Sequence, residues 1–152
     1  MNLNSDLIDL LRALNDQGAE YLIVGGYALA VHGRIRATKD VDVYVGTDPA
    51  NADKVWRALT AFGAPLEELR PDDLCRPDTF YIMGRPPNQI DIITTIDGVD
   101  FGRAWANRYE AEYGSLRVNY IGRTDLLANK EAADRPQDRL DAAYLRETAE
   151  ET

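Results

Sequence analysis

The stretch VGGYALAVHGRIRATKDVDVYV, residues 24–45, decides the expected fold. The apolar run from Tyr21 to Val24 stops abruptly at a Gly-Gly pair, which is typical of a buried strand entering a tight turn. Residues 27–32 then favour a short helix, and residues 41–45 place a valine at every second position. Such alternation is typical of a β-strand. The stretch therefore predicts a strand, a glycine turn, a helix and a second strand.

Gly25 and Gly26 lie where the predicted strand meets the predicted helix. Glycine lets a ligand approach the backbone closely, and the N-terminus of a following helix offers free N–H groups to an anion such as a triphosphate. The pair would serve equally well as a turn and nothing more. Both interpretations stay open at this point.

Asp40 and Asp42 open the second predicted strand. Because residues i and i+2 of a strand point to the same face, the two carboxylates are expected to lie side by side. Like charges in a half-buried site repel, and a bound divalent cation is a common way to stabilise them. The alternative is a solvated strand end in which Asp40 acts as a cap.

Asp91 lies in the apolar run 89–93, between isoleucines. A carboxylate in such a strand is costly unless it meets a partner or a metal, or unless the strand is at a sheet edge and the side chain faces water. If this strand lies beside Asp40 and Asp42, three carboxylates converge next to the glycine turn. Hard oxygen ligands of this kind suit Mg²⁺, and two such ions are expected.

The remaining patterns predict a single α+β domain over residues 1–152, with a small mixed β-sheet and helices packed mainly on one side. Helices are expected over residues 5–17, 49–63, 100–108, 125–133 and 136–149. Further strands are expected over 79–83, 89–95 and 115–121, the first two as a hairpin, and a loop over 64–77. Thr124 is expected to cap one helix, and Pro136 suits the first position of the last.

The chain has 152 residues, with 17 Lys and Arg against 26 Asp and Glu, a net charge of −9 at pH 7. This excess of negative charge disfavours extensive binding of duplex nucleic acid. One cysteine, Cys75, and one histidine, His32, exclude a disulfide framework and most zinc sites. Because no signal peptide or membrane-length apolar run is found, a cytoplasmic protein without a membrane span is expected.

Residues 24–45 followed by QIDIIT, residues 89–94, resemble the nucleotidyltransferase superfamily of the polymerase-beta type. In that superfamily a Gly-Gly or Gly-Ser turn precedes an Asp-x-Asp strand, and a third carboxylate lies on a later strand. The stretches 126–130 and 134–138 are similar to signatures of small bacterial members, including AbiEii-like toxin nucleotidyltransferases. The resemblance implies a nucleotidyltransferase-like fold in which Asp40, Asp42 and Asp91 are the metal ligands.

The resemblance also implies roles for Lys130, Arg135 and Asp138. Lys130 would contact the nucleotide phosphates or orient the site, and the other two residues would support it. The alternative for these three residues is a surface ion-pair network that contributes little to stability.

A basic cluster, Arg34, Arg36 and Lys39, lies between the glycine turn and the carboxylates. Its position suits contact with a triphosphate, although a solvated loop would have the same composition. Thr38 could hydrogen-bond a phosphate or cap the strand.

These features favour an enzyme that transfers a nucleoside monophosphate from an NTP to a hydroxyl group and releases pyrophosphate. Asp91 would also help to deprotonate the acceptor, which could be a tRNA 3′ end, a protein or a small molecule. The toxin-like relatives imply a toxin of a toxin–antitoxin pair, with a homodimer or an antitoxin as a further possible partner. The alternative is a non-catalytic nucleotide-binding or protein-interaction module on the same scaffold.

Overall fold

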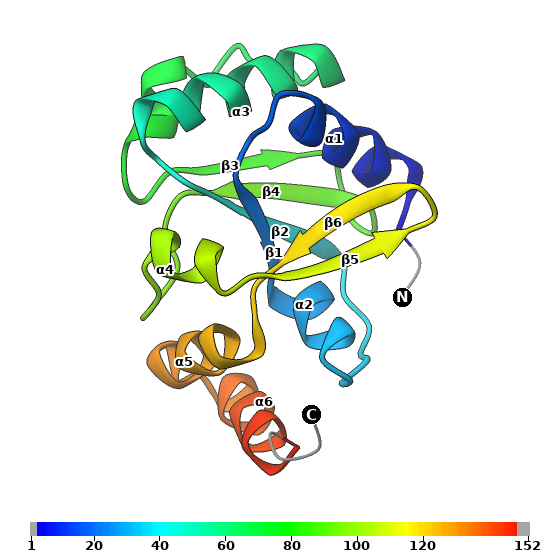
Figure 1. Ribbon diagram of the computed structural model, residues 1–152, viewed down its shortest axis with the longest axis vertical. Coiled ribbons are helices and arrows are strands. Elements are labelled where there is room, and N and C mark those ends of the chain that lie inside the picture. Colours follow the sequence, from blue (N-terminus) through cyan, green and yellow to red (C-terminus); the bar gives the residue numbers. More distant parts are fainter. Residues whose placement is uncertain (1–2, 149–152) are drawn as a thin grey trace.

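The computed structural model describes residues 3–148 and contains a six-stranded sheet surrounded by helices (Figure 1). The strands are β1 (Tyr21–Val24), β2 (Asp40–Val45), β3 (Phe80–Met83), β4 (Gln89–Ile93), β5 (Tyr109–Tyr113) and β6 (Leu116–Tyr120). The helices are α1 (Ser5–Asp16), α2 (Gly25–Val31), α3 (Pro49–Phe62), α4 (Phe101–Ala106), α5 (Arg123–Ala133) and α6 (Pro136–Glu147), with a short 3-10 helix, η1 (Pro71–Cys75).

The strands are ordered β3-β4-β2-β1-β6-β5 across the sheet. Strand β2 runs antiparallel to β1 and parallel to β4, and β1 runs parallel to β6. Two antiparallel hairpins, β3–β4 and β5–β6, form the two edges. The predicted α+β class, the mixed sheet and the first hairpin are therefore confirmed.

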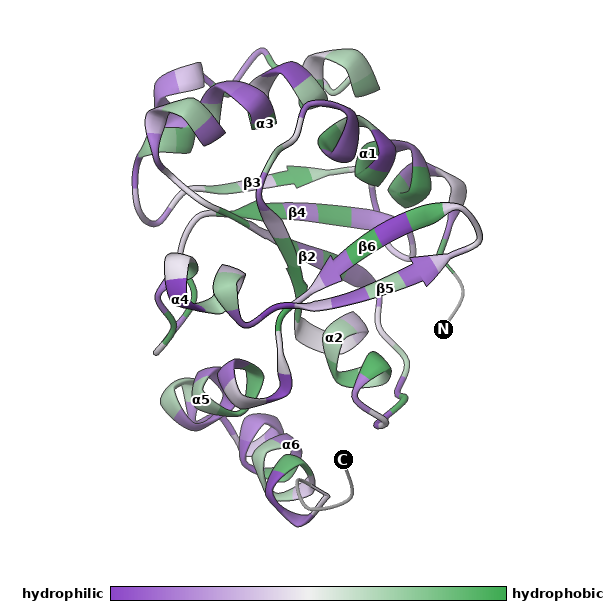
Figure 2. Ribbon diagram, viewed as in Figure 1, coloured by the Kyte–Doolittle hydropathy of each residue, from purple (hydrophilic) through white to green (hydrophobic). Residues whose placement is uncertain are grey.

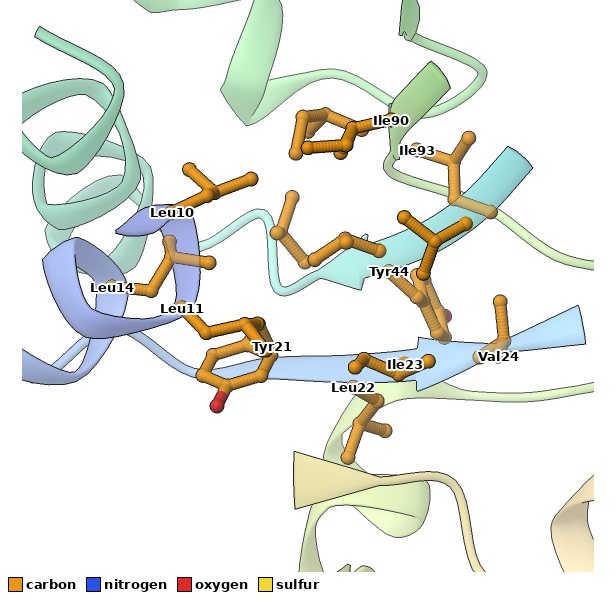
Figure 3. Close-up of a cluster of buried hydrophobic side chains, with 14 of the residues drawn as sticks. Leu10, Leu11, Leu14, Tyr21, Leu22, Ile23, Val24, Tyr44, Ile90 and Ile93 are labelled. Atoms are coloured by element: carbon orange, nitrogen blue, oxygen red, sulfur yellow. The ribbon is translucent and has the colours of Figure 1, made fainter. Parts of the chain in front are cut away.

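Helices α1 and α3 lie side by side against the sheet (Figure 1). The leucines of α1 recur at helical spacing and are fully buried. Figure 3 shows Leu10, Leu11 and Leu14 beside the apolar side chains of β1. Hydrophilic and hydrophobic residues alternate along α1 and α3 (Figure 2), so each helix buries one face and leaves the other in water.

Helices α5 and α6 pack against each other at the end of the molecule opposite α1 and α3 (Figure 1). As predicted, Pro136 is the first residue of α6, where its missing N–H leaves no helical hydrogen bond unmade. Within residues 3–148, none of the helices is long and apolar enough to cross a membrane.

Several boundaries and one strand differ from the prediction. Strand β5 was not predicted, although its sequence YEAEY alternates apolar and acidic residues; four of its five residues are exposed at the sheet edge. Thr124 does not cap α5, since Gly122 takes that position and the helix begins at Arg123. The predicted loop 64–77 contains η1, and the predicted end of the last helix at Ala149 lies outside the described residues.

Asn51 joins helix α3 to the ends of β1 and β2. Its side chain is 3% exposed. Its Oδ1 accepts from the backbone N–H of Glu20 at 2.7 Å, and its Nδ2 donates to the carbonyls of Glu20 at 3.0 Å and Gly46 at 2.8 Å. One buried amide thus satisfies three backbone groups at the point where the helix meets the sheet.

We expect Asn51→Ala to lower the free energy of unfolding by about 2–4 kcal/mol, because buried backbone groups lose their partners. Urea unfolding measures this change. Asn88→Ala, which alters an exposed asparagine in the β3–β4 turn, is the control and should change stability by less than about 0.5 kcal/mol. Equal stabilities for the two variants would contradict the bridging role of Asn51.

Candidate active site

Three carboxylates meet on one face of the sheet. Strands β2 and β4 are parallel neighbours, and their register places Asp42 opposite Asp91 and Asp40 opposite Gln89. One oxygen from each of Asp40, Asp42 and Asp91 lies within 4.8 Å of the others. Asp91 is 2% exposed, whereas the other two are half-buried. The convergence expected from the sequence therefore occurs.

Burial and the neighbouring carboxylates make Asp40 and Asp42 harder to ionise. Burial first, and then the charge of Asp40 and the contact with Asp91, raises the pKa of Asp42 to about 7. Burial and then Asp91 raise the pKa of Asp40 as well. Lys130 acts in the opposite direction on Asp42 and lowers its pKa. A cation bound beside the cluster would therefore stabilise the ionised carboxylates.

The glycine turn lies directly against the carboxylates. Helix α2 begins at Gly25 immediately after β1, earlier than the predicted start at residue 27. Gly25 has φ +67°, and a Cβ placed on it would lie 2.9 Å from Asp42 Oδ2. A Cβ on Gly26 would lie 3.3 Å from the side chain of Thr38, whose hydroxyl donates to the carbonyl of Asp40 at 2.9 Å. Gly25 thus combines a left-handed backbone with a close approach that excludes a side chain.

Lys130 lies in a buried ion-pair network, not a surface one. It is 4% exposed, and its Nζ lies 3.2 Å from Asp138 Oδ1 and 3.1 Å from Asp141 Oδ2. The Arg135 guanidinium lies 2.6 Å from Asp138 Oδ2 and is itself 76% exposed. Although burial opposes it, the hydrogen bonds from Arg135 and Lys130 lower the pKa of Asp138.

Asp141 is the residue of this network that the sequence analysis missed. It is fully buried, and Arg36 donates to both of its carboxylate oxygens at 2.8 and 2.7 Å. Arg34 Nε lies 3.3 Å from the same carboxylate. Arg34 and Arg36 are therefore paired with α6 rather than solvated, while Lys39 is exposed. Spacing could have indicated Asp141, because it lies three residues after Asp138 and so shares its helix face.

A cleft of about 400 Å³ runs from the carboxylates along α5. Gly25 and Asp42 line one end, and Lys130 and Arg135 line the wall formed by the last helices. The other lining residues, none assigned from the sequence, are Val24, Phe80, Ile93, Thr95, Ile96, Asp97, Asn129 and Ala133. The structure thus brings Gly25, Asp42 and the two predicted cations Lys130 and Arg135 to one cleft. The lining residues do not include Gly26, Asp40, Asp91, Arg34, Arg36 or Lys39.

This mixed sheet, with a glycine turn against an Asp-x-Asp strand and a third aspartate on the parallel neighbour, defines a nucleotidyltransferase-like domain. Residues 2–145 match the family model described as nucleotidyltransferase of unknown function (DUF6036), and the chain belongs to that family. No curated protein gives a significant sequence match.

The stability of the protein should depend on the titration of Asp42. Its pKa of about 7 in the folded state exceeds the ordinary value of 3.8. The folded state therefore holds more protons than the unfolded state between these values, so this group's contribution to stability is full below about pH 4 and is lost as pH rises to about 7. Urea unfolding from pH 4 to 8 should show this loss in the wild type relative to Asp42→Asn. Parallel pH profiles would contradict the assignment.

Gly25→Ala and Gly18→Ala separate backbone strain from the close approach to Asp42. The two glycines have φ of +67° and +68°, but nothing lies within 4 Å of a Cβ on Gly18. Gly18→Ala should cost about 1–2 kcal/mol from the left-handed backbone alone. Gly25→Ala should cost about 1–3 kcal/mol more, because the carboxylate must also move. Chemical denaturation of both variants measures the difference, and equal costs would show that the contact is unimportant.

Proposed function

We propose that the protein is a magnesium-dependent nucleotidyltransferase that moves a nucleoside monophosphate from an NTP to a hydroxyl acceptor. The observation that carries this proposal is the cluster of Asp40, Asp42 and Asp91, with oxygens within 4.8 Å, against the glycine turn. Membership of the nucleotidyltransferase family supports it. The alternative, a non-catalytic binding module, gains no support from a cluster that retains all three acids.

The three carboxylates fit Mg²⁺. They offer hard oxygen ligands at one point of the sheet, and the raised pKa of Asp42 reflects a local excess of negative charge that a cation would relieve. When bound, one or two Mg²⁺ ions would neutralise the carboxylates and lend positive charge to the phosphate oxygens and the pyrophosphate leaving group.

Asp91 is the residue that we propose as the proton acceptor. Gln89 donates to Asp91 Oδ1 at 2.8 Å, which fixes the orientation of the carboxylate. In the reaction, the acceptor oxygen forms a bond to the α-phosphorus, the bond from that phosphorus to the bridging oxygen breaks, and pyrophosphate leaves. The proton of the acceptor hydroxyl passes to Asp91, so that charge and atoms balance.

The cations of the cleft would bind the phosphates. Both Lys130 and Arg135 line the cleft, and the Arg135 side chain is largely exposed. The backbone N–H groups at Gly25 and Gly26 would contact the leaving phosphates. Arg34 and Arg36 would act through Asp141, and contacts of Thr38, Lys39 and Asp138 with the nucleotide stay predictions.

The finer assignments implied by the AbiEii-like resemblance also stay predictions. They comprise a tRNA 3′ end as acceptor, an antitoxin partner, a homodimer and a toxin role. A cytoplasmic location belongs with them.

Calorimetry with ATP, CTP, GTP and UTP, with and without Mg²⁺, tests the metal site. We expect Mg²⁺-dependent NTP binding that Asp42→Asn weakens at least about tenfold, because one ligand carboxylate is lost. The control is Asp53→Asn, which alters a largely exposed aspartate on α3 and should bind as the wild type does. Unchanged binding by Asp42→Asn would overturn the metal role. Incubation of NTPs labelled at the α-phosphate with a broad acceptor set then tests transfer, and no labelled product with any nucleotide would favour the binding module.

A further inference from the structure

Two large apolar side chains are exposed on the edge strand β3. Phe80 is 60% and Ile82 is 52% exposed. They are two residues apart, so they share one face of the strand. Met83, on the other face, is buried against the core. Adjacent exposed apolar side chains are a feature of ligand-binding surfaces.

The strand register places this pair on the face that carries the carboxylates. Ile82 is opposite Asp91, and Asp91 is in turn opposite Asp42. Phe80 is opposite Ile93 in the next row. Because directly opposed residues share a face, Ile82 is the lateral neighbour of Asp91 on the side away from Asp42. Phe80 also lines the cleft.

The elements around the carboxylates differ in the charge that they contribute, although Phe80 lines the same cleft as Lys130 and Arg135. Gly25, Lys130 and Arg135 lie on the side of β1, α5 and α6, which suits the polyanionic triphosphate. The β3 side presents Phe80 and Ile82 beside the proposed proton acceptor. An acceptor must place its hydroxyl at Asp91, so it approaches over β3. Phe80 and Ile82 themselves offer no cation to a polyanionic acceptor.

We propose that Phe80 and Ile82 form the acceptor platform, and that the acceptor is an uncharged molecule whose hydroxyl is attached to an aromatic or aliphatic body. This inference rests on the proposed function, because it assigns the second substrate of the same site. The body packs on the two side chains, the hydroxyl oxygen attacks the α-phosphorus and its proton passes to Asp91, while pyrophosphate leaves from the cationic side.

Saturation-transfer NMR with benzyl alcohol as the probe tests the platform without any nucleotide. The ring protons should be saturated by the wild-type chain, and Phe80→Ala should reduce the effect at least about twofold by removing the aromatic partner. Tyr113→Ala is the matched control, because it removes a part-exposed aromatic from β5 at the opposite sheet edge, and it should behave as the wild type does. No saturation in the wild type, or equal saturation with Phe80→Ala, would overturn the platform.

Transfer from an NTP labelled at the α-phosphate then tests the acceptor class. The wild type should prefer benzyl alcohol to glycerol by about tenfold in kcat/KM, and Phe80→Ala and Ile82→Ala should each reduce that preference with little change in the KM of the NTP. A raised KM for the NTP with an unchanged preference would assign Phe80 to the nucleobase and overturn the proposal. Preferred labelling of an RNA 3′ end would overturn the acceptor class.

Different results would overturn the proposed function and the acceptor platform. If no acceptor of any kind is labelled, the proposed function is overturned, and the NMR result still decides whether the platform binds an aromatic alcohol. If transfer occurs but Phe80→Ala and Ile82→Ala leave the preference intact, the proposed function stands and the platform is overturned. Because both side chains are more than half exposed, neither substitution should alter folding.

Discussion

The surrounding structure accommodates the repulsion among Asp40, Asp42 and Asp91. Two parallel strands in fixed register hold their oxygens within 4.8 Å of one another, although like charges at that separation favour moving apart. The neighbours accommodate this arrangement in different ways. Gly25 leaves room for the Asp42 carboxylate, and Lys130 lowers its pKa. A rigid sheet is needed for such a cluster, because a flexible loop would relax.

The ion-pair network behind the cleft complements this cluster. Among residues 3–148, four cationic side chains pair with two carboxylates there, Asp138 and Asp141, so positive charge is in excess within this network. The four are Lys130, Arg34, Arg36 and Arg135. Removing one partner from buried pairs of this kind is strongly destabilising, because an uncompensated charge is left. The fully buried Asp141 joins α6, α5 and the segment after α2 in one arrangement. The network therefore fixes the positions of Lys130 and Arg135 relative to the acids.

Local residue patterns correctly predicted the individual strands that carry the acids. The alternation of valines identified β2, and the isoleucines around Asp91 identified β4 as a buried strand. Residue spacing does not show which strands are neighbours in the sheet. The proximity of Asp42 and Asp91 therefore depended on the strand order, which the sequence did not give. Strand β5 alternates apolar and acidic residues, but it is a sheet-edge strand in which only Ala111 is partly buried, so it contributes little apolar burial. Asp141 was not identified from the sequence, because its burial depends on the packing of α5 against α6.

The order of the elements along the chain has a consequence for synthesis. Asp40 and Asp42 precede the third acid by the whole of α3, η1 and β3, and the carboxylate partners of Lys130 come later still, on α6. Closing such long loops costs conformational entropy, and the contacts of the completed sheet offset that cost. A chain leaving the ribosome N-terminus first holds no acid cluster until β4 has docked, and its lysine stays unpaired until the last helix emerges. During synthesis the complete site can therefore form only after α6 has been made.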